Sequence, residues 1–187
     1  RPGIMLTKQF QHKSSELALD DLSRQRSWAQ YRDNIFANVE RLQSLGIKPG
    51  DHVALLMHNR VEYIEIVTAC FLTGVWLTPV NWHLAEVEIR YILEDSGARL
   101  LITEAAYGDF AQSLQIAVIN IDREYLPAAA SLSLETLDLE AEPGAVMMYT
   151  SGTTGKPKGV KRARSATIRE FFTVQANSGQ AIGFDGL

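Results

Sequence analysis

Cysteine is almost absent from this sequence of 187 residues, which contains only Cys70. A single cysteine cannot form an internal disulfide, and the four histidines show no spacing typical of a metal site. Cys70 lies in an apolar run, where we expect a small buried residue. The composition therefore excludes a disulfide framework within the chain and fits a reducing compartment, and we expect the cytoplasm.

A strong excess of either charge is also lacking, since the net charge is −4. Nucleic-acid binding domains are usually basic, so we expect no nucleic-acid partner. One long stretch, between Glu65 and Glu86, has no Asp, Glu, Lys or Arg and approaches the length of a membrane span. Gly74 and Pro79 interrupt it, which favours a buried helix followed by a buried strand and predicts no transmembrane segment.

The rest of the chain alternates between short apolar runs and helical periodicity. Ser27 and Gln30 form a capping-box pattern before a helix that we expect to end at Gly46. Two short strands around a turn are predicted over 17–26, and residues 122–144 are interpreted as a surface connection. The other predicted elements are strands at 53–57, 75–80, 100–102, 117–121 and 146–149, and helices at 61–72, 84–93 and 105–115. This alternation predicts an α/β fold, with a mostly parallel sheet and helices on both faces.

The most informative segment follows the predicted strand 146–149. Its three glycines allow the main chain to approach a ligand closely, and its hydroxyls and lysines can bind anions. The segment contains Thr150, Ser151, Gly152, Thr153, Thr154, Gly155, Lys156, Pro157, Lys158 and Gly159. Together these residues predict a cradle for a polyphosphate. The spacing differs from that of a Walker loop, and no dinucleotide-binding glycine pattern occurs in the chain. A flexible linker is the alternative interpretation.

Residues 149–160 closely resemble the phosphate-binding signature of the adenylate-forming superfamily. That superfamily includes acyl-CoA synthetases, firefly-type luciferases and the adenylation domains of peptide synthetases. Residues 45–54 are similar to its Leu-Gly-x-x-x-Gly-Asp-x-Val-Ala segment. Residues 78–81 and 93–98 are similar to elements of acyl-CoA synthetases and favour that branch. The resemblance covers most of the chain.

The resemblance implies a two-step ligase. A carboxylic acid, expected to be a fatty acid, would react with ATP to form an acyl-adenylate, and coenzyme A would then accept the acyl group. ATP, Mg²⁺ and coenzyme A are the implied cofactors. The implied phosphate-binding residues are Thr150, Ser151, Gly152, Thr153, Thr154, Gly155, Lys156, Lys158 and Gly159. Among these, Ser151, Thr153, Thr154 and Lys158 are expected to contribute most.

Members of this superfamily run several hundred residues, and their later motifs do not occur in this sequence. We therefore expect residues 1–187 to be the N-terminal portion of an AMP-binding domain that is inactive alone. The catalytic lysine and the magnesium-binding glutamate of the family have no counterpart here. An incomplete sheet would expose its edges, so we expect the isolated portion to self-associate or to be marginally stable.

Several alternatives stay open at this point. The acceptor could be a carrier protein, or the acid could be an amino acid, because the discriminating pocket residues lie beyond this sequence. A non-catalytic nucleotide-binding module is an alternative of a different class. The basic run after the loop (Lys161, Arg162, Arg164 and Arg169) is interpreted either as a solvated face or as a contact for nucleotide phosphates or a phosphoanionic partner.

Overall fold

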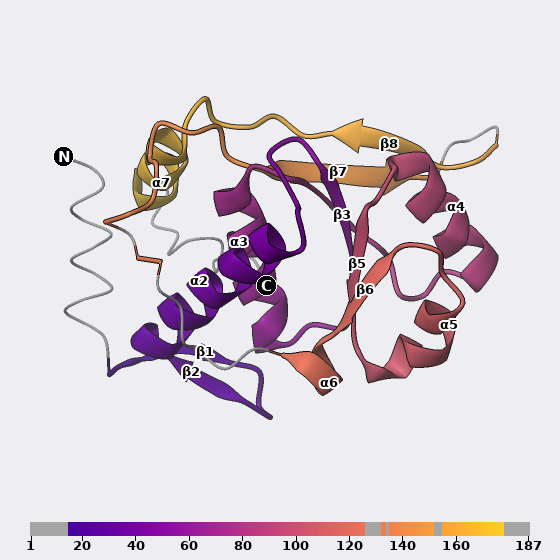
Figure 1. Cartoon of the computed structure of the whole chain (residues 1–187), viewed down its shortest axis with the longest axis horizontal. Helices are drawn as coiled ribbons and strands as arrows, with labels where there is room; N and C mark the ends of the chain where they lie inside the picture. The colour runs from indigo at the N-terminus through magenta and orange to yellow at the C-terminus, as the bar shows by residue number, and fades with distance from the viewer. Residues whose placement is uncertain (1–14, 126–131, 134, 152–154, 178–187) are drawn as a thin grey trace.

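The computed structural model describes residues 15–125, 132–133, 135–151 and 155–177, with side chains up to residue 173. Helices surround a single large sheet, and a small β-hairpin stands apart from it (Figure 1). In chain order the elements are β1 (Leu17–Asp20), β2 (Gln25–Ser27), α2 (Trp28–Ser44), β3 (His52–Leu56), α3 (Val61–Thr73), β4 (Trp76–Pro79), α4 (Glu86–Ser96), β5 (Leu100–Thr103), η1 (Ala105–Tyr107), α5 (Gly108–Gln112), β6 (Ala117–Asn120), α6 (Ile121–Glu124), β7 (Ala145–Thr150), β8 (Lys158–Lys161) and α7 (Ile168–Asn177).

The large sheet has the strand order β6-β5-β3-β4-β7-β8. All neighbouring strands are parallel except β7 and β8, which form an antiparallel pair at one edge. The predicted α/β class and the mostly parallel sheet are therefore confirmed. Helix α3 connects β3 to its neighbour β4. Helix α4 then connects β4 to β5, which lies on the other side of β3, so the two connections run in opposite directions along the sheet.

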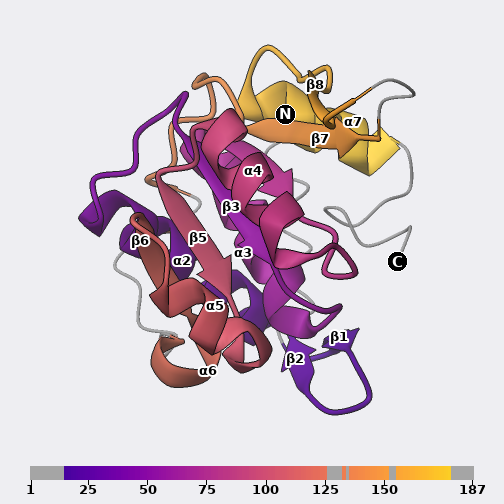
Figure 2. The same ribbon diagram turned by 90° about the vertical axis from the view of Figure 1, so that its right-hand side faces the viewer.

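Successive residues of the central strand β3 enter two separate cores, as the two-residue period of a strand requires. Val53 and Leu55 pack with side chains from α2, α3 and α7. Ala54 and Leu56 pack with side chains from α4 and α5. The prediction of helices on both faces is thus confirmed, and Figure 2 shows α4 and α5 on the side of the sheet opposite α3.

Local signals predicted the long helix α2 correctly. The Ser27 hydroxyl accepts a hydrogen bond from the backbone N–H of Gln30 at 3.1 Å, and the Gln30 side chain accepts from the Ser27 N–H at 2.8 Å. After the helix ends, Gly46 adopts a φ of +75°, in the left-handed region. The capping box and the glycine stop are both confirmed.

Some predicted boundaries and one predicted segment were wrong. The predicted helix over 105–115 is a 3₁₀ turn followed by the five-residue helix α5, and Ile121 begins α6 instead of ending a strand. The segment 122–144 is more than a surface connection, because Leu132, Leu137 and Leu139 pack against the core beside α2 and α3. Apolar residues without a regular period gave no local signal of this packing.

A buried carboxylate on α3 connects this helix to β2 and to the residue that follows α6. The side chain of Glu65 on α3 is completely buried, and the Arg26 Nε lies 2.8 Å from its Oε1. The Tyr125 hydroxyl donates to Oε2 at 3.0 Å. Burial raises the pKa of Glu65 to about 7, against the opposing effects of Arg26 and of the hydrogen bonds.

We expect Glu65 to make the free energy of unfolding fall as pH rises. Its ordinary pKa is 4.5, so the folded state holds the proton more tightly than the unfolded chain does. This contribution is complete below pH 4.5 and is lost as pH rises through 7, by up to about 3 kcal/mol. The denaturant midpoint at pH 5 and pH 8 measures the fall. Glu65→Gln, which cannot titrate, should flatten it, and an unchanged fall in that variant would contradict the assignment.

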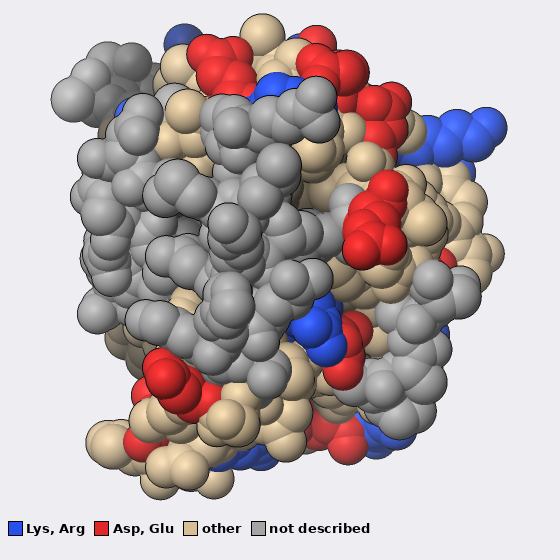
Figure 3. Space-filling model, turned by 90° about the vertical axis from the view of Figure 1, so that its left-hand side faces the viewer, with Lys and Arg blue, Asp and Glu red and all other residues tan. Residues whose placement is uncertain are grey.

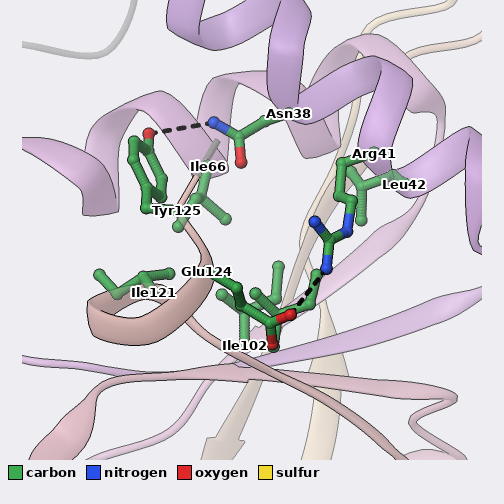
Figure 4. Close-up of a pocket in the computed structure, with 9 residues that line it drawn as sticks. Asn38, Arg41, Leu42, Ile66, Ile102, Ile121, Glu124 and Tyr125 are labelled. Carbon is green, nitrogen blue, oxygen red and sulfur yellow. Dashed lines mark hydrogen bonds and ion pairs between the residues drawn. The ribbon is translucent and has the colours of Figure 1, made fainter. Parts of the chain in front are cut away.

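A small pocket lies between α2, α3, β5, β6 and α6 (Figure 4). Asn38 donates to the Tyr125 hydroxyl at 3.0 Å on one side, and Arg41 pairs with Glu124 at 2.9 Å on another. The space for the centre of a water molecule is about 10 Å³. This is room for roughly one water and too little for a substrate, so this pocket is not the candidate site.

Candidate functional site

The predicted phosphate-binding segment connects two strands of a β-hairpin. β7 runs parallel to β4, and β8 returns antiparallel to β7, with Thr150 directly opposite Lys158. The connection therefore emerges at the carboxyl end of the parallel strands, where ligands bind in open α/β sheets. Thr150, Ser151, Gly155, Lys156, Lys158 and Gly159 are described there, whereas Gly152, Thr153 and Thr154 lie outside the described residues. The strand β8 was not predicted from the sequence.

Helix α4 supports the hairpin from one face of the sheet. The Tyr149 hydroxyl donates to the carboxylate of Asp95, and the Tyr91 hydroxyl donates to the carbonyl oxygen of Pro157 at 3.1 Å. Burial, together with the nearby Asp95 charge, raises the pKa of Tyr149, so this phenol is a neutral donor. Tyr91 and Asp95 lie four residues apart on one helix and face the same way. Both ends of the loop are thus held by α4.

Two glycines of the loop meet specific conformational needs. Gly155 has a φ of +151°, which residues with a side chain rarely adopt. Gly159 packs against Tyr149 on the neighbouring strand, and a Cβ there would lie 3.2 Å from the ring and 3.1 Å from the Met147 sulfur. Both positions therefore favour glycine for the shape of the loop itself.

The basic residues of the loop and those that follow it do not form one patch. The Lys156 Nζ lies 4.8 Å from the centre of the Tyr91 ring, and the exposed Lys158 lies opposite Thr150. Lys161 and Arg164 lie over Trp76, which begins β4 at the other end of the sheet, at 4.5 and 5.0 Å. Only the first two lie at the loop. On the face in Figure 3, basic and acidic side chains are interspersed over the described surface.

A second group of side chains at the carboxyl end of the strands was missed by sequence reasoning. The His58 ring lies 4.3 Å from the Trp82 ring, between their centres, and 5.8 Å from the Tyr107 ring. The Nδ1 of His58 lies 3.2 Å from a carboxylate oxygen of Glu104, which is buried. Neither His58 nor Trp82 belongs to a recognisable motif in the sequence. The available signal was that each follows the end of a predicted parallel strand.

Comparison with known proteins agrees with this geometry. A protein-family model described as "AMP-binding enzyme" matches residues 6–183. The chain belongs to the AMP-binding enzyme family. The predicted resemblance to adenylate-forming enzymes is thereby confirmed.

Curated relatives in this AMP-binding family are ligases that act on different acids. The 2-succinylbenzoate–CoA ligase of Bacillus subtilis is 37% identical over 124 residues, which are 66% of this chain and 25% of that protein. The fatty acid–[acyl-carrier-protein] ligase ScoC of Streptomyces coeruleorubidus is 35% identical over 153 residues, which are 78% of this chain and 28% of that protein. The chain thus spans about a quarter of the length of these relatives.

Solved structures in the family share the fold. The O-succinylbenzoate coenzyme A synthetase of Bacillus subtilis, in complex with AMP, superposes with a TM-score of 0.69 at 30% identity. That match covers 93% of this chain and 44% of the other. A fatty acyl CoA synthetase of Mycobacterium tuberculosis superposes with a TM-score of 0.72 at 28% identity, covering 87% of this chain and 34% of the other.

The described residues also bear on metal binding and on membrane insertion. No group of three or more His, Cys, Asp or Glu side chains in them is placed to hold a metal ion. Across the same ranges, every helix is too short or too polar to cross a membrane.

Proposed function

We propose that residues 1–187 are the N-terminal portion of the AMP-binding domain of an ATP-dependent acid–thiol ligase. The single observation that carries this proposal is the β7–β8 hairpin, which presents the signature segment at the carboxyl end of the parallel strands. Family membership and the ligase names of relatives support it. In this role the hairpin binds the β- and γ-phosphates of ATP through Ser151, Thr153, Thr154 and Lys158.

The proposed reaction has two steps. A carboxylate oxygen of the acid attacks the α-phosphorus of ATP, forming an acyl-adenylate as the bond to pyrophosphate breaks. The sulfur of a thiol then attacks the acyl carbon, which forms a thioester and releases AMP. The chain's part in the first step is positioning and charge neutralisation at the leaving phosphates. No residue of the described ranges is assigned to Mg²⁺, which would be bound by the phosphates of ATP.

The acid is proposed as a class, and two members are favoured by relatives. The fatty acid expected from the sequence agrees with the names of ScoC and of the mycobacterial synthetase. An aromatic dicarboxylic acid agrees with the 2-succinylbenzoate ligases of Bacillus subtilis and of Geobacillus kaustophilus, the latter 39% identical over 145 residues. The fatty acid therefore has no priority over the aromatic acid.

Carboxylate-dependent exchange between ATP and pyrophosphate tests the proposal. We expect the full-length gene product to catalyse exchange with one class in a panel of fatty acids of different lengths, benzoates and 2-succinylbenzoate, and the 187-residue chain to catalyse none. A folded full-length protein that binds ATP but exchanges with no acid would instead support a non-catalytic nucleotide-binding module.

A carrier protein is the second candidate acceptor, because ScoC is named for one. The two acceptors are distinguished once the acid is known. Coenzyme A and a phosphopantetheinylated acyl-carrier protein are each supplied to the preformed acyl-adenylate, and release of AMP is followed. We expect rapid release with coenzyme A, whereas release with the carrier protein alone would assign the other function.

A further inference from the structure

We propose that Tyr91 is a positioning residue for the phosphate-binding loop, and that Lys156 acts through Tyr91 rather than as a phosphate ligand. The proposal rests on the function proposed above. It concerns two consecutive residues of the loop that contact one aromatic side chain of α4. The Tyr91 hydroxyl donates to the Pro157 carbonyl at 3.1 Å, and the Lys156 Nζ lies 4.8 Å from the centre of the Tyr91 ring.

The hydrogen bond to Pro157 determines how Lys158 is presented. The Pro157 carbonyl belongs to the same planar peptide group as the Lys158 nitrogen, so holding the carbonyl fixes the plane from which Lys158 extends. The proline ring also restricts the preceding rotation of the backbone. Lys158 is then the first residue of β8 and lies opposite Thr150. A tyrosine on α4 thus sets the direction of the loop's exposed lysine.

The contact with Lys156 directs that side chain toward α4. An ammonium group over the face of an aromatic ring is attracted by the negative face of the ring. Lys158, in contrast, forms no ion pair or ring contact with the described residues. The two lysines therefore have different roles in the geometry: Lys156 is engaged by the protein, and Lys158 is available to an anion.

The support that Tyr91 offers is itself well defined. Its ring packs partly buried against the core between α4 and the sheet. The helix begins where the Ala85 N–H donates to the Glu88 carboxylate at 2.8 Å, and it ends at Gly97 with a φ of +66°. One turn beyond Tyr91, Asp95 accepts from Tyr149 on β7. The loop is therefore held by contacts to a helix whose two ends are both capped.

The test is a double-mutant cycle on the affinity of the full-length protein for ATP. We expect Tyr91→Leu to weaken binding about tenfold and Tyr91→Phe, which keeps the ring but not the hydroxyl, to weaken it about threefold. Lys156→Met should weaken binding about threefold alone and have no further effect in the Tyr91→Leu background. The ATP affinity of the Lys156→Met variant should depend on ionic strength as strongly as that of the wild type, whereas Lys158→Ala should reduce that dependence. Equal melting temperatures of the Tyr91 variants control for folding.

The opposite pattern would overturn the proposal. If Lys156 binds the phosphates, Lys156→Met weakens ATP binding by the same factor in both backgrounds and reduces the dependence on ionic strength.

A second readout needs no nucleotide and separates this proposal from the proposed function. Lysines of the full-length protein are ¹³C-methylated, and the Lys156 signal is identified by its absence in Lys156→Arg. We expect an upfield ring-current shift that persists in Tyr91→Phe and disappears in Tyr91→Leu. A signal at the position of an exposed lysine would overturn the proposal, even in an active ligase. A protein that shows the shift but binds no ATP would refute the proposed function and keep the docking of Lys156 on Tyr91.

Discussion

Replacing Lys158 by alanine is expected to lower the rate of ATP–pyrophosphate exchange by the full-length protein by about 100-fold, as loss of one donor to developing charge does elsewhere. Lys158 is exposed and lies opposite Thr150, at the carboxyl end of the parallel strands. In the function proposed above, its positive charge is available to the pyrophosphate as it departs. Exchange rates at saturating and limiting ATP, with the identified acid, measure the loss in both kcat and kcat/KM.

The matched control is Lys48→Ala, which removes the same charge at a distant position. Lys48 is an exposed residue of the turn before β3, at the amino end of the parallel strands. We expect exchange by this variant to stay within twofold of the wild type, because a screened charge more than a Debye length away, about 8–10 Å, contributes little. Equal losses in the two variants would reduce the role of Lys158 to net charge and would count against a phosphate contact.

The elements that the sequence predicted well are those whose signals are local. The capping box of Ser27 and Gln30 and the glycine after α2 specify both ends of a helix within a few residues. The apolar runs of β3 and β5 are buried on both faces, which is typical of a parallel sheet. The fold class followed from the alternation of such runs with helices.

The features that sequence reasoning missed depend on contacts between distant segments. β8 is exposed at all four residues, so no apolar alternation marks it, and only its pairing with β7 makes it a strand. His58 and Trp82 meet because β3 and β4 are neighbours in the sheet, which the chain order alone does not specify. The segment proposed to bind phosphate was found from its residue types. The contact between Lys156 and Tyr91 joins residues 65 positions apart in the sequence, so it is visible only in the structure.

The position of the hairpin depends on a glycine outside the signature. Gly144 directly precedes β7, and its N–H donates to the Phe71 carbonyl at 2.8 Å. A Cβ at this position would lie 2.4 Å from the Val75 oxygen and 2.6 Å from the Cys70 oxygen. Both are backbone atoms, one in the last turn of α3 and the other just before β4, so neither can rotate away. We expect Gly144→Ala to destabilise the protein by about 3 kcal/mol, at the upper end of the usual cost of overpacking, measured by chemical denaturation.

The effect should reach the site as well as the fold, because β7 must shift away from β4 to relieve the clash. The Trp76–Ala145 pairing lies next to Gly144, and the same strand ends at Thr150 in the loop. Folded Gly144→Ala protein is therefore expected to bind ATP more weakly than the wild type. Gly108→Ala is the control, since a Cβ there has only one neighbour, at 3.7 Å, and the φ of −58° is helical. If the two variants were equally stable, the close approach at Gly144 would not constrain β7, and the loop would owe its position to α4 alone.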